Sequence, residues 1–158
     1  MHSAILILGS NIQPEVYIVK ALKELASRFS IERVSNLIET KSEGSNGPNF
    51  LNLAVKIHTD SSLDDLKYQK LRCIEDDLGR VRTHDKNAPR TIDIDIMIFD
   101  GQIVDHHIWE YIYLAVPLSE IEPQLVDPQS GQDIASIAKQ LKRRAFWKAR
   151  PDISGISI

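Results

Sequence analysis

Every second residue from position 92 to position 98 is an isoleucine, and this alternation limits what the chain can fold into. Successive side chains of a β-strand point to opposite faces, so the pattern predicts a strand at 91–99 with all its isoleucines on one buried face. Asp93 and Asp95 stand between the isoleucines. They therefore share the other face, which we expect to line a cleft.

Two aspartates on one face of a strand are expected to need a positively charged partner. Alternate residues of a strand lie about 6.5–7 Å apart, close enough for like charges to repel unless a cation lies between them. Magnesium is usually held by one or two carboxylates together with the oxygens of substrate phosphates. Asp93 and Asp95 are therefore candidate magnesium ligands beside a polyphosphate. The alternative is that they lie on a solvated strand edge.

Arginines stand on both sides of the loop that precedes this strand. Arg80 and Arg82 follow a predicted helix, and Arg90 leads directly into the strand. A guanidinium group is always charged, and its planar fork matches the oxygens of a phosphate. The sequence thus predicts that groups for a cation and groups for an anion converge at one end of the strand.

The run from Gly79 to Phe99 resembles the signature of the 6-hydroxymethyl-7,8-dihydropterin pyrophosphokinases, which act in folate biosynthesis. It reads Gly-Arg-Val-Arg, a short loop, then Pro-Arg-Thr-Ile-Asp-Ile-Asp-Ile-Met-Ile-Phe. The resemblance implies transfer of pyrophosphate from ATP, the co-substrate, to 6-hydroxymethyl-7,8-dihydropterin, giving AMP and the pterin diphosphate. It also implies two magnesium ions, bound by Asp93 and Asp95.

The same resemblance implies roles for four further residues. Arg80 and Arg90 would be catalytic groups that offset charge on the phosphates, and Arg82 would assist in binding the nucleotide. Glu75 would lie beside the nucleotide. Judged as a lone residue, Glu75 is more typical of a solvated charge on a helix surface.

A second alternating run, 50–57, places Phe50 and Asn52 on its open face. An aromatic ring can stack on a flat heterocycle, and an amide can match its donors and acceptors. The alternative is a surface phenylalanine beside an ordinary polar residue. The resemblance favours the first interpretation, because it implies that Thr40, Phe50, Asn52 and Tyr113 bind the pterin. The glycine- and serine-rich loop 41–48 is a candidate lid.

The stretch 117–123, Pro-Leu-Ser-Glu-Ile-Glu-Pro, also matches the resembled family. The segment before Pro117 is shorter than is usual there and lacks further arginines, and Asn87 stands where many members have tryptophan. An alternative function is therefore a diverged pterin or nucleotide binder with weak or altered transferase activity. A third candidate, a metal-dependent nuclease or RNA-binding module, lacks the expected aromatic and basic strand pattern.

The remaining pattern predicts the fold. Ala4 to Leu8 is a strand, 9–11 are turn and cap residues, and helices are expected at 14–29, 62–78 and 134–141. The order strand, helix, strand, strand, helix, strand predicts an α+β, ferredoxin-like βαββαβ sandwich with helices packed on one face of a mainly antiparallel sheet. At 158 residues, the chain is expected to form one pyrophosphokinase-like domain, 1–158.

Composition sets the expected partners and location. A net charge of −3 argues against nucleic-acid binding, and the basic residues near the end of the last helix suit its dipole. The single cysteine, Cys73, excludes an internal disulfide, and we expect it to be a small core residue. The amino-terminal apolar run is too short to span a membrane. We expect a cytoplasmic monomer whose partners are ATP and a dihydropterin.

Overall fold

The computed structural model describes residues 1–153 and residue 156 of the chain. Its centre is a sheet in the strand order β6-β5-β1-β4-β3-β7, with β2 beside β4. All of these pairings are antiparallel. The strands are β1 (His2–Ser10), β2 (Ser30–Val34), β3 (Ile38–Thr40), β4 (Phe50–Thr59), β5 (Asp93–Phe99), β6 (Gln102–Ile103) and β7 (Trp147–Ala149).

The strand β1 lies at the centre because it is apolar on both faces. It pairs with β4 on one side and with β5 on the other. Leu6 and Leu8 are buried in one hydrophobic cluster, and Ile5 and Ile7 are buried in another on the opposite face. Burying a leucine or isoleucine side chain contributes about 1.5–3 kcal/mol, so this strand stabilises both layers.

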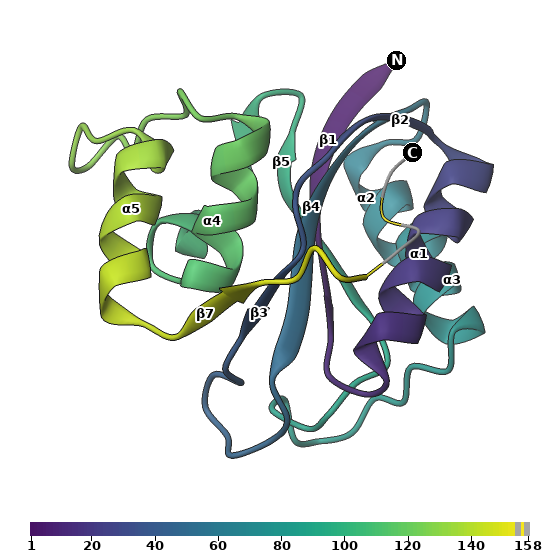
Figure 1. Cartoon of the computed structure of the whole chain (residues 1–158). Coiled ribbons are helices and arrows are strands. Elements are labelled where there is room, and N and C mark those ends of the chain that lie inside the picture. The colour runs from purple at the N-terminus through teal and green to yellow at the C-terminus, as the bar shows by residue number, and fades with distance from the viewer. Residues whose placement is uncertain (154–155, 157–158) are drawn as a thin grey trace.

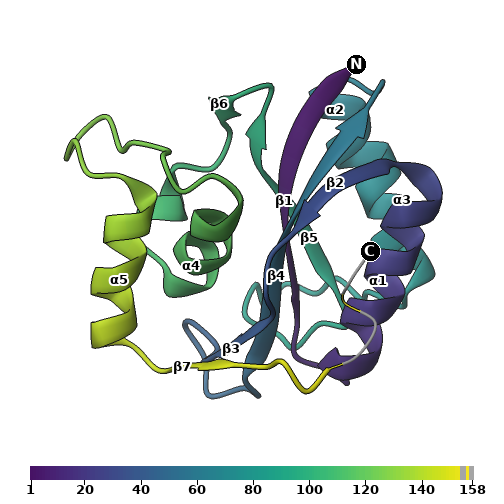
Figure 2. The same cartoon turned by 45° about the horizontal axis from the view of Figure 1, so that its top comes forward.

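Helices lie on both sides of the sheet (Figures 1 and 2). On the Leu6 face are α1 (Pro14–Arg28), α2 (Leu63–Asp65) and α3 (Arg72–Asp77), and on the other face are α4 (Ile112–Ile121) and α5 (Ile134–Arg144). The predicted α+β sandwich, with helices against a mainly antiparallel sheet, is confirmed. The helix predicted at 134–141 forms as α5, but α4 was not predicted, and the two helices cover a second face where helices were expected on one face only. The α4 sequence is apolar on nearly every side and contains Pro117, so it carries no clear helical period.

In the described part of the chain, no helix is both long enough and apolar enough to cross a membrane.

The isoleucine alternation in β5 is interrupted by a β-bulge. Ile5 pairs with Ile98, but the next residue, Leu6, pairs with Ile96, so Met97 is the extra residue. A bulge turns the following side chains to the opposite face. Ile94 and Ile96 pack towards α1, whereas Ile98 packs with the cluster beneath α4. The prediction of one continuous isoleucine face is therefore wrong at its last position.

The helix predicted at 62–78 forms, but its middle is a π-helix. Leu66–Leu71 joins α2 to α3 in this wider form. Leu66 and Leu71 are both buried although they are five residues apart, whereas α-helical neighbours on one face are three or four apart. In the π turn the hydrogen bonds join residues five positions apart, so Leu66 and Leu71 lie on the same face of the helix.

The π turn also decides which way the later residues point. Glu75 lies nine positions after Leu66. In a regular α-helix nine residues make about two and a half turns, so Glu75 would lie opposite Leu66 and face away from the sheet. Instead Glu75 is buried and faces β5. Cys73, expected in the core, is exposed. That expectation was wrong because it assumed an uninterrupted α-helical period.

Deleting Gln69, an exposed residue within the π turn, is predicted to leave a regular α-helix with its buried face in register. The midpoint temperature of thermal unfolding should then change by no more than about 4 °C. Deleting the exposed Lys23 from α1 is the matched control. This deletion rotates the buried Leu25 by about 100° away from the core, so it should lower the free energy of unfolding by at least about 3 kcal/mol. Equal destabilisation by the two deletions would contradict this account of the helix.

Candidate active site

A cleft of about 310 Å³ opens where β1, β4 and β5 meet the loop 41–49 and the start of α4. Its lining includes seven residues proposed from the sequence: Thr40, Phe50, Asn52, Arg90, Asp93, Asp95 and Tyr113. A second hollow of about 300 Å³ lies next to it and is lined by Arg80 and Arg82. Lys86 and Arg90 line both, so the two hollows adjoin.

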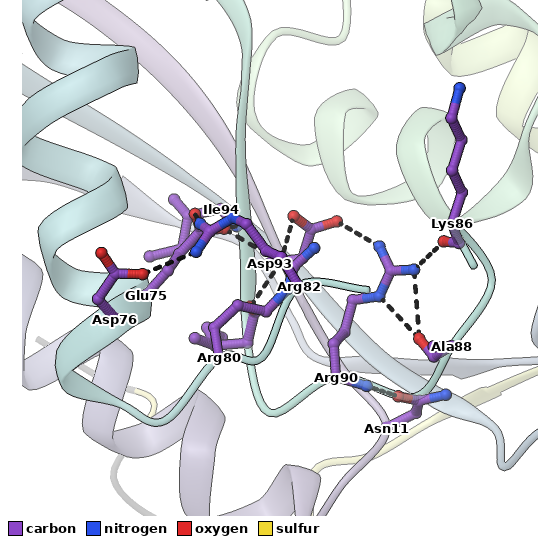
Figure 3. Close-up of polar contacts among 11 residues, drawn as sticks. Asn11, Glu75, Asp76, Arg80, Arg82, Lys86, Ala88, Arg90, Asp93 and Ile94 are labelled. Carbon is purple, nitrogen blue, oxygen red and sulfur yellow. Dashed lines mark hydrogen bonds and ion pairs between the residues drawn. The ribbon is translucent and has the colours of Figure 1, made fainter. Parts of the chain in front are cut away.

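Two guanidinium groups meet the carboxylate of Asp93 (Figure 3). Nη1 of Arg80 lies 3.0 Å from Oδ1, and Nη1 of Arg90 lies 3.2 Å from Oδ2. The Arg80 and Arg90 side chains are only 14% and 18% exposed, so water screens these ion pairs less than it would at the surface. The predicted convergence of arginines on the aspartate strand is therefore present.

Glu75 holds the helix end, the strand and two arginines together. Its Oε2 accepts a hydrogen bond from the backbone N–H of Ile94 at 2.9 Å, and Arg80 lies 3.3 Å from the same oxygen. Nη2 of Arg82 lies 2.6 Å from Oε1. Burial raises the pKa of Glu75 to about 7, while the Ile94 hydrogen bond and the two arginines oppose that shift. The interpretation of Glu75 as a solvated helix charge is wrong.

Asp95 lies on β5 two residues after Asp93 and lines the cleft. Burial raises the pKa of Asp95 to about 8, and the nearby charges of Asp93 and Glu75 act in the same direction. The Asp95 side chain is open to the cleft on one side, so the like charges of Asp93 and Glu75 contribute to the pKa shift together with burial. Asp95 thus lies where negative charge is in excess and a cation would be stabilised.

The far end of the cleft suits a flat polar ligand. Asn52 and Thr40 are both buried, and Nδ2 of Asn52 donates to Oγ1 of Thr40 at 2.9 Å, which orients the amide. A Cβ at Gly9 would lie only 3.1 Å from Oδ1 of Asn52, so glycine makes room for that amide. The guanidinium carbon of Arg90 lies 5.9 Å from the centre of the Phe50 ring.

Tyr113 closes the cleft from the first turn of α4. Its ring stacks on Tyr111, with centroids 5.5 Å apart and planes inclined by 28°. Burial raises the pKa of Tyr113 to about 12, so its hydroxyl stays protonated at neutral pH. Phe50 and Tyr113 thus present two aromatic rings to the same cleft.

The sequence predicted a candidate lid at 41–48, but it did not predict which loop residues line the cleft. The cleft is also lined by Lys41, Ser42, Glu43, Lys86 and Asn87. Loop conformation leaves no hydrophobic period in the sequence, so only the length and polarity of these loops could have drawn attention to them. Asn11, expected as a cap residue, does not cap α1. The N-cap position is Gln13, which makes no side-chain capping bond.

Among the described residues, no group of three or more histidine, cysteine, aspartate or glutamate side chains is arranged to enclose a metal ion. Asp93 and Asp95 therefore offer an open, two-carboxylate site. Each carboxylate oxygen has two lone pairs, so the arginines at Asp93 leave acceptor capacity for a cation. This donor set suits magnesium, which usually takes the rest of its ligands from water and substrate phosphates.

Comparisons with known proteins agree with this arrangement. A model of the family described as 7,8-dihydro-6-hydroxymethylpterin-pyrophosphokinase (HPPK) matches residues 5–123. A 2-amino-4-hydroxy-6-hydroxymethyldihydropteridine pyrophosphokinase of Synechocystis sp. is 32% identical over 96% of this chain and 83% of its own. The enzyme of the same name from Aquifex aeolicus is 35% identical over 81% of this chain and 85% of its own.

The fold is also found in solved HPPK-DHPS structures. One from Plasmodium falciparum, with SDX-DHP, has a TM-score of 0.67 at 13% identity, and another, in complex with substrates, has 0.70 at 12%. Each match covers 91% of this chain, which spans 44% and 46% of those longer chains.

Replacing Glu75 with alanine is predicted to destabilise the fold by at least about 3 kcal/mol, because the partly buried Arg80 and the Ile94 N–H lose an acceptor that they share. Asp76→Ala is the matched control. The Asp76 side chain pairs with Arg82 and is 57% exposed, so the loss of stability should stay below about 1 kcal/mol. Urea unfolding measures both values. If Glu75→Ala lowered the free energy of unfolding as little as Asp76→Ala, the role of Glu75 in holding the helix end, the strand and the arginines together would be contradicted.

Proposed function

This chain belongs to the 7,8-dihydro-6-hydroxymethylpterin-pyrophosphokinase family, and on that premise we propose how its cleft performs the reaction. The enzyme acts at the pyrophosphokinase step of folate biosynthesis, with ATP as co-substrate. It transfers pyrophosphate to 6-hydroxymethyl-7,8-dihydropterin, giving AMP and the pterin diphosphate. The observation that carries the residue assignments is that Arg90 lines both hollows and pairs with Asp93 in the cleft.

The pterin is proposed to occupy the 310 Å³ cleft. Its ring would lie between Phe50 and Tyr113, since aromatic rings stack on flat heterocycles. The Asn52 amide, held by Thr40, would match the donors and acceptors at the ring edge. Both residues are buried and pre-oriented, which reduces the entropy lost on binding.

The phosphates of ATP are proposed to lie along the neighbouring hollow. Arg80, Arg82 and Arg90 line it, and Glu75 orients two of these side chains. Guanidinium groups already held by carboxylates need little reorganisation when charge moves between phosphate oxygens. Arg80 and Arg90 are therefore assigned the catalytic role, and Arg82 and Glu75 the nucleotide-binding role.

Asp93 and Asp95 are proposed to hold two magnesium ions. Magnesium, when bound, neutralises charge on the phosphates and lowers the pKa of a coordinated hydroxyl group. The raised pKa of Asp95 supports this assignment, because the cluster of acids favours a positive partner.

The protein's main contribution is alignment of the two substrates. The pterin hydroxymethyl oxygen bonds to the β-phosphorus of ATP as the bond to the AMP oxygen breaks, and the hydroxyl proton is lost. The Phe50 and Tyr113 walls fix the acceptor, while Arg80 and Arg90 hold the phosphates and stabilise charge on the departing AMP. Phosphoryl transfer depends chiefly on such positioning and charge stabilisation.

The whole chain, 1–158, is proposed to form one domain, since β7 pairs with β3 beyond the matched residues 5–123. The enzyme is proposed to act as a monomer without nucleic acid, because one chain supplies every assigned residue. It is proposed to act in the cytoplasm, where the net charge of −3 is unremarkable.

One observation favours the alternative of a diverged binder. The hollow beyond Tyr113 is lined by Glu43, Asp105, His107 and Tyr111 and contains no arginine. This is the side on which the shortened segment before Pro117 lies. Pterin and nucleotide binding by calorimetry, without any AMP formed, would support that alternative. Family membership leaves the nuclease or RNA-binding candidate without support.

Asp95→Asn is predicted to reduce magnesium-dependent AMP formation by at least about a thousandfold, because a neutral amide is a weak ligand for a hard cation. The fold should persist, since Asp95 lines the cleft and not the core. Asp64→Asn, a change of an exposed aspartate in the first turn of α2, is the control. A folded Asp95→Asn variant with a near-normal rate would refute the metal assignment.

Magnesium binding is predicted to release a proton at neutral pH. In the free protein the pKa of Asp95 is raised to about 8, so at pH 7 the carboxyl is mostly protonated and must ionise to bind the cation. Affinity should therefore rise with pH until about pH 8. Calorimetry with magnesium and a non-hydrolysable ATP analogue, in two buffers of different ionisation enthalpy, measures the proton. Identical heats in both buffers would contradict the prediction.

A further inference from the structure

Asn11 is a buried polar residue that the mechanism above does not use. It follows the end of β1, is 4% exposed and lies outside the lining of the cleft. It does not cap α1, because the N-cap position belongs to Gln13. A buried amide is costly unless its donors and acceptors are bonded, so its partners indicate its role.

Asn11 holds the backbone of Arg90 by two hydrogen bonds, and Figure 3 shows the one to the side-chain oxygen of Asn11. The N–H of Arg90 donates to Oδ1 of Asn11 at 2.8 Å, and the N–H of Asn11 donates to the carbonyl of Arg90 at 3.1 Å. Both polar groups of the Arg90 backbone are therefore fixed to the end of β1. This connection joins residues 79 positions apart.

The other end of the amide reaches the opposite loop. Nδ2 of Asn11 donates to the carbonyl of Pro48 at 3.3 Å. Pro48 belongs to the loop 41–49, which contributes Lys41, Ser42 and Glu43 to the cleft wall. One side chain thus joins the bases of the two loops that border the cleft.

The guanidinium group of Arg90 is placed by contacts that depend on this backbone position. It donates to Asp93 and to the carbonyls of Ala88 and Lys86, and it lies over Phe50. A shift of the Arg90 backbone would therefore move the cation relative to Asp93 and relative to the wall of the cleft.

We propose that Asn11 is a positioning residue that sets the place of Arg90 for phosphate transfer and ties it to the loop 41–49. This inference rests on the proposed catalytic role of Arg90. Asn11 acts through its amide oxygen on Arg90 and through its amide nitrogen on Pro48, so the two effects can be separated by substitution.

The first test is a double-mutant cycle on AMP formation. Asn11→Ala is expected to lower kcat between about tenfold and a hundredfold, since small displacements of a catalytic group have effects of that size. In an Arg90→Ala background the same change should have less than about a twofold effect, because the group that it positions is gone. Fully additive losses would overturn the proposal.

Conservative and control variants separate positioning from loss of fold. Asn11→Asp keeps an oxygen for the Arg90 N–H but removes the donor to Pro48, so its kcat should be at least about fivefold above that of Asn11→Ala, with a raised KM for the pterin. Asn49→Ala removes an exposed amide of the same loop, bonded only to Glu39, and should change kcat by less than about twofold. Equal kcat values for Asn11→Asp and Asn11→Ala would overturn the proposal.

Amide hydrogen exchange needs no substrate, so it tests the role of Asn11 independently of the proposed enzyme activity. Amide hydrogen exchange in Asn11→Ala should become faster at Arg90 and in the loop 41–49, with β1 and α1 unchanged. Unchanged exchange in both segments would overturn the proposal, whatever the activity. If the wild-type protein formed no AMP, the proposed function would fail, and the exchange experiment would still decide whether Asn11 holds the two loops.

Discussion

The carboxylate of Asp93 accepts one guanidinium group on each oxygen, and the layout of both hollows depends on this contact. Arg80 reaches it from the end of the α3 helix, and Arg90 reaches it from the loop before β5. The strand, the helix end and the loop are thereby held at one point. The side chains that could bind phosphates and those that could bind a cation are neighbours because of it.

Three acids and three arginines make up this cluster, and water screens its contacts least at Glu75, Arg80 and Arg90, whose side chains are largely shielded. Glu75 orients Arg80 and Arg82, and it bonds the backbone of β5. Asp95 is the one acid of the three for which the described residues provide no arginine within ion-pairing distance. Burial and the nearby charges of Asp93 and Glu75 raise its pKa, and this excess of negative charge makes it a suitable place for a cation.

Two irregularities in the secondary structure place these groups. The bulge at Met97 ends the alternation of β5 just beyond Asp95, so the two aspartates face the cleft while Ile98 packs beneath α4. The π turn at Leu66–Leu71 rotates the following turn so that Glu75 faces β5. Irregularities of both kinds are common beside functional sites, because they re-aim side chains without changing the fold.

The sequence alone determined the long strands β1, β4 and β5, the helices predicted at 14–29, 62–78 and 134–141, and the identity of the charged cluster, because alternation, helical spacing and the Gly79–Phe99 motif are local patterns. Only the tertiary structure decided the bulge, the burial of Glu75, the exposure of Cys73 and the role of Asn11. The directions of Glu75 and Cys73 depend on the π turn, which lets both Leu66 and Leu71 pack into the core. The bulge and the role of Asn11 depend on partners distant in the chain, Ile5 for Ile98 and Arg90 for Asn11. A local pattern carries no information about such a partner, since pairing is settled only when the strands, helices and loops pack together.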